Sequence, residues 1–186
     1  MNTNRPHFTN ADIARLLAAT TGSRYEIRDR CVILLMFRHG LRVSEAAGLT
    51  VADVDMANRS LHVKRLQGGL SSTHPLRRDK VRLLKAWLVE RERLKPRGTR
   101  LFVSERRQPL SRKTIWVLIR RYGTLAGLPR LAHPQMLRHG CGYALVEQKT
   151  ETQVIQQYLG HRYLLHTLKY TAQRPIQFAT LWRERA

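Results

Sequence analysis

Cysteine is scarce in this 186-residue sequence, and long apolar runs are missing. The two cysteines, Cys31 and Cys141, lie in helix-like segments, which favours buried reduced thiols over a disulfide framework. The longest apolar run, residues 31–37, is far shorter than the roughly 20 residues that cross a bilayer. The N-terminal residues lack the apolar stretch of a signal peptide. We therefore expect a soluble, cytoplasmic protein that makes no membrane contact.

Acidic residues are also few, since 13 Asp and Glu stand against 34 Lys and Arg and give a formal net charge of +21 at pH 7. The basic residues are spread along the whole chain, which favours a broad nucleic-acid surface over a membrane-binding helix. Aromatic residues make up only 7% and do not alternate with basic residues as in a single-strand stacking platform. The expected partner is double-stranded DNA held through its phosphates.

No linker or internal repeat divides the sequence, so residues 1–186 are expected to form a single domain. The hydrophobic pattern predicts a mainly α fold with a small antiparallel β-sheet. A helix is expected from the capping residue Asn10, and residues 23–26 have capping-box spacing before an apolar helix that ends at Gly40. Two strands, residues 61–65 and 72–76, flank a glycine turn at 67–69, and a short strand is expected at 100–104. Further helices are expected over residues 43–49, 79–94, 111–126, 134–148, 150–159 and 175–183.

Several kinds of reactive site are not supported by the residues present. The sequence has no phosphate-cradling glycine loop before a helix, no Cys-x-x-Cys pair and no convincing carboxylate cluster. His133, His139 and Cys141 lie close together, but their spacing matches no zinc pattern. No metal or other cofactor is expected, and the residues left to carry chemistry are arginine, histidine and tyrosine.

Three segments of the sequence contain these residue types close together. They read FRHGLRVSEA at residues 37–46, HPQMLRHGCG at 133–142 and YLGHRYLLHTLKYT at 158–171. Together they resemble the motifs of the tyrosine site-specific recombinases, also called the phage integrase family. The resemblance implies the catalytic-domain fold of that family. It also implies that Arg42 and Arg138 bind the scissile phosphate, that His161 assists, and that Tyr170 is the nucleophile.

The chemistry of these residue types agrees with the resemblance. A tyrosine hydroxyl that attacks a DNA phosphodiester retains the bond energy as a 3′-phosphotyrosine, so rejoining needs neither ATP nor metal. Two forked guanidiniums suit the oxygens of a pentavalent phosphate. The sequence also allows other roles for these residues. Arg42 and Arg138 are also explained as ion-paired or phosphate-contacting residues, and Tyr170 as a packed tyrosine. Glu45 is expected to support Arg42, although a capping role explains it equally well.

Two positions depart from the family pattern. Three residues before the second arginine the family usually has a histidine that transfers a proton, and this sequence has Gln135, which can only form hydrogen bonds. The family's catalytic lysine, the acid for the leaving 5′-hydroxyl, usually sits by the hairpin turn, where this sequence has Gln67. Lys64 is the nearest lysine, and His139 is expected to be structural or supporting. If nothing replaces them, each loss costs on the order of 10² to 10⁴ in rate.

The short segment before Arg42 and the residues after Tyr170 resemble the compact bacterial recombinases that invert a promoter segment in fimbrial phase variation. This predicts a nucleoid-associated protein that acts on short inverted repeats as a tetramer, with accessory DNA-bending proteins. An apolar helix in about residues 171–186 would then dock on a neighbouring subunit, or pack on its own chain. The alternative is a DNA-binding transcription regulator that keeps the fold but has lost efficient cleavage.

Overall fold

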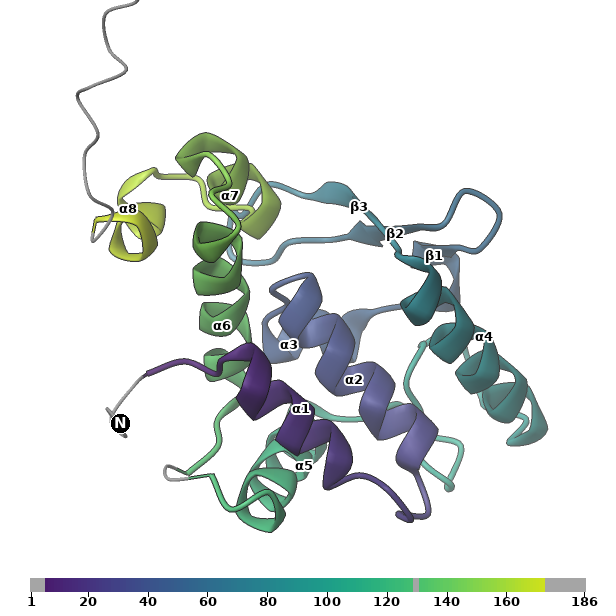
Figure 1. The fold of residues 1–186 in the computed structure, drawn as a ribbon. Helices are drawn as coiled ribbons and strands as arrows, with labels where there is room; N and C mark the ends of the chain where they lie inside the picture. The colour runs from purple at the N-terminus through teal and green to yellow at the C-terminus, as the bar shows by residue number, and fades with distance from the viewer. Residues whose placement is uncertain (1–5, 129–130, 173–186) are drawn as a thin grey trace, which may run out of the picture.

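The computed structural model describes residues 6–128 and 131–172. This part of the chain is mainly helical, with one small antiparallel sheet, as the sequence predicts (Figure 1). The helices are α1 (Asn10–Ala18), α2 (Glu26–Arg38), α3 (Val43–Gly48), a 3-10 turn η1 (Val51–Asp53), α4 (Arg78–Arg93), α5 (Arg112–Leu125), α6 (Pro134–Glu147), α7 (Thr152–Leu159) and α8 (Leu165–Thr171). The strands are β1 (Val54–Asp55), β2 (Ser60–Val63) and β3 (Ser72–Pro75).

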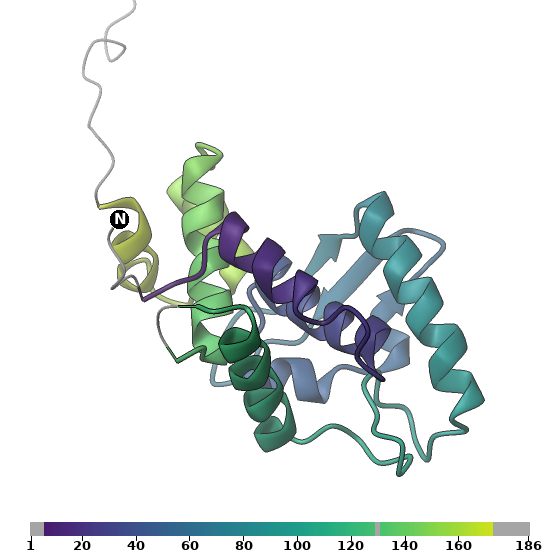
Figure 2. The ribbon, with the colours of Figure 1, turned by 60° about the horizontal axis from the view of Figure 1, so that its bottom comes forward.

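Helix α2 forms the centre of the fold and contacts α1, α3, α4, α5 and α6. Its residues Cys31, Val32, Ile33 and Leu35 are all at most 1% exposed, so apolar side chains surround the helix. In Figure 1 the helix α4 flanks α2 on the side away from α6, and in Figure 2 the sheet lies behind α2 while α1 crosses in front. The end of α2 is therefore fixed by packing on several sides.

The sheet confirms the predicted hairpin and adds one short strand. β2 pairs antiparallel with β3, with Leu61 opposite His74, and β1 pairs with the other edge of β2. The hairpin loop, residues 64–71, contacts the C-terminal end of α7, where the Leu70 N–H donates to the Gly160 carbonyl at 3.2 Å. A loop that follows the first arginine motif is thus joined to the segment that carries His161.

Two predicted helix starts are wrong in detail. The side chain that caps α1 is Thr9, not Asn10, and Asp12 completes its capping box. The capping box predicted at Ser23 does not form: α2 begins after Tyr25, which makes no side-chain cap, and the Ser23 hydroxyl accepts a hydrogen bond from Tyr122. The Glu26 carboxylate instead accepts one from the N–H of Gly22. Long-range packing has replaced the local capping interaction.

The strand predicted at residues 100–104 is also wrong. This segment makes only isolated bridges, between Thr50 and Arg100 and between Val103 and Pro109. Leu101, Phe102 and Val103 are all at most 1% exposed. Its apolar run therefore reflects burial from all sides and not the alternation of a half-buried strand.

The remaining helices agree with the prediction, except at the C-terminal end. The helices expected over 43–49, 79–94, 111–126, 134–148 and 150–159 are confirmed by α3 to α7, with ends that shift by up to two residues. Helix α8 was not predicted, and the helix expected over 175–183 lies outside the described residues. Cys31 and Cys141 are free and buried, as predicted. Cys141 joins Ile155, Leu159 and Tyr170 in a small cluster that holds α6, α7 and α8 together.

Candidate active site

Arg42 lies just before α3, where its backbone is extended and begins the helix. Its N–H donates to Glu45 Oε2 at 2.8 Å, and its Nη1 donates to Glu45 Oε1 at 2.8 Å. Glu45 therefore both caps α3 and orients the arginine. The Arg42 side chain remains 24% exposed while that of Glu45 is 1% exposed, so the guanidinium is the part of this pair that solvent reaches.

Arg138 lies on α6 and is 2% exposed. Its Nη1 donates to the Gly40 carbonyl, and its Nη2 donates to the Leu159 carbonyl at 2.7 Å. Gly40 ends α2 with a φ of +57°, and a Cβ there would lie 2.5 Å from Leu159 Cδ2, so only glycine fits. Arg138 Nη1 is 3.9 Å from Glu45 Oε2, which brings both predicted arginines around one carboxylate.

Arg65 also belongs to this cluster, although none of the three sequence motifs contains it. Its side chain is fully buried and donates to Glu45 Oε2 at 2.9 Å and to the carbonyls of His39 at 2.9 Å, Gly40 at 3.0 Å and Tyr158 at 2.7 Å. The signal that would have found it is the two-residue period of Leu61 and Val63, which extends to position 65 and points Arg65 inward.

The charges of this cluster stay ionised at neutral pH. Burial opposes ionisation of Glu45, but the N–H of Arg42 and the charge of Arg65 outweigh it and lower the pKa of the carboxyl below its usual value. Burial, Arg65 and Arg42 lower the pKa of Arg138 to about 10, which still leaves a full positive charge at pH 7. Three buried or half-buried cations thus share one buried carboxylate, and the excess positive charge suits an anion.

Tyr170 lies on α8 beside α6 and is 2% exposed. Its hydroxyl is 2.8 Å from His139 Nδ1, and its ring lies over Gly142, where a Cβ would come within 2.8 Å of the ring. The ring of His161 runs parallel to that of Tyr170 at 6.3 Å. Burial raises the pKa of Tyr170 well above its usual range, so the phenol is protonated.

His161 follows α7 and is oriented by a neighbouring hydroxyl. Its Nδ1 is 2.9 Å from Thr167 Oγ1, on the next helix. Burial, with Arg138 and Lys169 as further causes, lowers the pKa of His161 to about 3, so the imidazole is neutral at pH 7. A neutral ring held in this way offers a hydrogen-bond donor at one nitrogen only.

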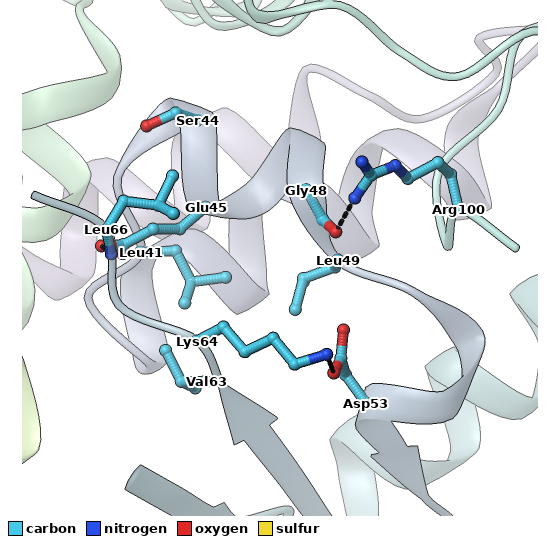
Figure 3. A pocket seen from close by; sticks show the side chains of 10 residues that line it. All are labelled: Leu41, Ser44, Glu45, Gly48, Leu49, Asp53, Val63, Lys64, Leu66 and Arg100. Atoms are coloured by element: carbon cyan, nitrogen blue, oxygen red, sulfur yellow. Dashed lines mark hydrogen bonds and ion pairs between the residues drawn. The ribbon is translucent and has the colours of Figure 1, made fainter. Parts of the chain in front are cut away.

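The structure does not bring Lys64 and the two glutamines into this cluster. Lys64 pairs with Asp53 at 2.8 Å, and its side chain is 64% exposed. Figure 3 shows it extending toward Asp53, while Glu45 lies at the other end beside Leu66. These residues line a pocket of about 310 Å³. Gln67 is exposed in the hairpin loop, and Gln135 is exposed in the first turn of α6.

Other candidates have structural roles. His133 caps α6, where its Nδ1 accepts from the N–H of Gln135. Tyr158 stacks on His74 at 3.9 Å and its hydroxyl donates to the Arg38 carbonyl, whereas Tyr163 is 63% exposed. Within residues 6–128 and 131–172, no group of three or more His, Cys, Asp or Glu side chains is placed to hold a metal ion.

Residues 6–175 match the model of the phage integrase family. The chain belongs to this family. It is 39% identical over 180 residues to the type 1 fimbriae regulatory protein FimE of Escherichia coli K12. The alignment covers 96% of this chain and 91% of FimE. It is 38% identical over 182 residues to FimB of the same strain, covering 97% and 91%. By sequence similarity, this member of the phage integrase family is therefore a tyrosine recombinase.

Solved structures agree on the fold. The crystal structure of XerA recombinase superposes with a TM-score of 0.80 at 26% identity, over 90% of this chain and 60% of that one. XerH recombinase bound to its difH substrate superposes with a TM-score of 0.77 at 24% identity, over 90% of this chain and 50% of that one. The fold is thus the catalytic-domain fold of tyrosine recombinases. No helix in the described part of the chain has the length and apolar character needed to span a membrane.

Proposed function

We propose that this protein is a site-specific DNA recombinase that cuts and rejoins strands through a 3′-phosphotyrosine at Tyr170. The observation that carries the proposal is the convergence of Arg42 and Arg138 around Glu45, with His161 and Tyr170 on the adjoining α7–α8 segment. These residues come from three sequence motifs that lie far apart in the chain. Their meeting at one place is what a phosphoryl-transfer site requires.

The roles follow from the charges and hydrogen-bond groups. Arg42 and Arg138 stabilise the charge that develops on the non-bridging oxygens of the attacked phosphate. His161 donates a hydrogen bond to the same phosphate, and Glu45 supports Arg42. The Tyr170 oxygen replaces the 5′-oxygen at phosphorus, and the bond energy is kept for rejoining. A metal is not needed, because the guanidiniums supply the positive charge.

Access of DNA to this site requires a movement. Arg138 and Tyr170 are each 2% exposed, so a phosphodiester reaches the hydroxyl only when the groups that cover these two side chains shift aside. Helix α8 is short, and its outer residues Leu165 and Leu168 are 74% and 40% exposed. DNA binding, or a neighbouring subunit, supplies the free energy for this shift.

The substrate class is inferred from the relatives. FimE and FimB are named as regulators of type 1 fimbriae, and they align with nearly the whole of this chain. We infer that the chain acts as a single catalytic domain that inverts a promoter segment between short inverted repeats. Four copies assemble on two DNA sites, accessory DNA-bending proteins assist, and the reaction takes place in the cytoplasm at the nucleoid. The net charge of +21 favours such a DNA complex.

A second candidate function is a DNA-binding regulator that cleaves poorly. Gln67 and Gln135 favour it, because both occupy places where the family has proton-transferring side chains. This candidate predicts sequence-specific DNA binding without a covalent intermediate.

A covalent-trapping assay separates the two candidates. Nicked duplexes that carry inverted repeats from beside the gene are incubated with the protein, and denaturation-resistant complexes are counted. The recombinase forms an adduct that Tyr170→Phe abolishes while DNA binding persists, and Tyr163→Phe, which changes an exposed tyrosine, is the matched control. An adduct that persists in Tyr170→Phe would remove this residue from its role. Tight binding without any adduct would support the regulator.

A further inference from the structure

The position where the family pattern has a proton-transferring histidine carries Gln135 in this chain. Gln135 is exposed at the start of α6, and an amide cannot accept a proton at neutral pH. On the same helix, one residue after Arg138, His139 is half-buried and faces α8. The distance of 2.8 Å between its Nδ1 and the Tyr170 hydroxyl is that of a hydrogen bond.

The contact between His139 and Tyr170 is held by its surroundings. The Tyr170 ring meets the edge of Tyr143 at 5.1 Å and lies against Gly142, both on the same helix as His139. The His161 ring lies nearly parallel to the Tyr170 ring, with 6.3 Å between their centroids. The hydroxyl is therefore directed at the imidazole by packing around the whole ring.

We propose that His139 is the group that accepts the proton of Tyr170 during strand cleavage. This inference rests on the proposed recombinase function. The Tyr170 oxygen forms its bond to phosphorus as its proton passes to His139 Nδ1. The P–O5′ bond breaks, and the 5′-oxygen leaves with that electron pair and takes a proton from water. Rejoining reverses each step, so His139 returns the proton to the tyrosine.

The charges around His139 keep its imidazole neutral but also make it a weaker base before DNA binds. Arg138 on its own helix, Lys169 and Tyr170 on α8, and His7 in the segment before α1 surround it. Burial, Lys169, Arg138 and His7 lower its pKa to about 4, so it is neutral at pH 7 and has a lone pair to accept with. A phosphodiester bound beside Arg138 offsets these positive charges. The basicity of His139 therefore rises when the substrate is in place.

The test is the cleavage rate of His139→Gln on a nicked duplex in a single turnover. Glutamine keeps a hydrogen-bonding side chain but cannot take the proton, so we expect a loss on the order of 10²-fold with DNA binding unchanged. His62→Gln is the matched control, because His62 is exposed on β2. If His139→Gln does not bind DNA, His139→Asn, which sets an amide near the place of Nδ1, replaces it.

A second readout separates proton transfer from positioning. With 3,5-difluorotyrosine at position 170 the phenol is more acidic, so the proton leaves more readily and the loss caused by His139→Gln should shrink to less than about 10-fold. The same loss with both nucleophiles would overturn the proposal, since it would mean that His139 only positions the ring. Unchanged cleavage would overturn it too. Faster cleavage would also overturn it, since His139 would then restrain Tyr170 and not accept its proton. A wild-type protein that forms no adduct would instead refute the recombinase function itself.

Discussion

The buried cluster around Glu45 and the exposed hairpin loop beside it differ in how far each is built for catalysis. In the cluster, Arg42, Arg65 and Arg138 are held by Glu45 or by main-chain carbonyls, and their positions are fixed before any DNA binds. In the loop, Gln67 is exposed, and Lys64 points to Asp53. Stabilisation of charge depends on a rigid frame, and the frame is present. Proton transfer depends on single side chains, and the two at which this chain is expected to differ from the family pattern, Gln67 and Gln135, are exposed.

The largest expected effect is a difference in stability between variants of two neighbouring residues, Arg65 in the buried cluster and Lys64 in the exposed loop. Arg65→Met removes a buried cation from Glu45 and leaves the His39 and Tyr158 carbonyls without the donor that Arg65 supplies, so we expect a loss of about 3–5 kcal/mol in the free energy of unfolding. Lys64→Met breaks a pair whose lysine is 64% exposed, and we expect a loss of about 1 kcal/mol at most. Urea denaturation of both variants measures the contrast. Equal losses would mean that the buried frame is no more important than the loop.

The next effect tests whether the loop can be given back its missing acid. Gln67→Lys places an ammonium group by the turn, where it can protonate the leaving 5′-oxygen, and we expect cleavage to rise on the order of 10²-fold. A substrate with a 5′-bridging sulfur needs no acid to leave, so its cleavage should be the same in the variant and the wild type. A gain with both substrates would argue that Gln67→Lys acts through DNA binding instead.

The smallest effect compares buried and exposed histidines by pH. Burial lowers the pKa of His39 and His74 to about 3, well below their value in the unfolded chain. Between pH 6.5 and 3 the unfolded state binds more protons than the folded one, so the free energy of unfolding falls as the pH is lowered. His74→Phe keeps the stacking on Tyr158 and should flatten this slope by up to about 1.4 kcal/mol per pH unit.

Denaturation of this variant at pH 7, 6 and 5 measures the change in slope. His62→Phe, at an exposed position opposite Thr73, is the control for replacing a histidine by phenylalanine outside the core. If all three proteins lose stability in parallel, the buried histidines are not the groups that titrate.

Local patterns predicted most of the fold because they arise from local causes. The period of α4 to α7 and the glycine turn of the hairpin depend on neighbours in the sequence. The failures are where distant residues decide. The Ser23 hydroxyl bonds to Tyr122 instead of capping its own helix, and residues 100–104 are apolar because they are buried and not because they form a strand.

The candidate site divides in the same way. The motifs that place Arg42, Arg138, His161 and Tyr170 could be read from the sequence, and the structure brings these four residues together. Arg65 belongs to none of these motifs, and its one signal is the two-residue period of Leu61 and Val63, which places it on the buried face but does not show that it binds Glu45. The contact of His139 with Tyr170 joins two helices that are separate in the sequence, so no local sequence pattern predicts it.

The Gly40 carbonyl accepts hydrogen bonds from both Arg65 and Arg138. A main-chain oxygen has the same chemistry whatever the side chain is, so no substitution that spares the backbone can remove this acceptor. Arg138 is thus anchored to a main-chain atom, and the substitution that would displace this anchor is one at Gly40 itself, where a side chain does not fit. Under the proposed function, changes at exposed positions such as Gln67 and Gln135 alter the speed of strand cutting while this main-chain anchor stays in place.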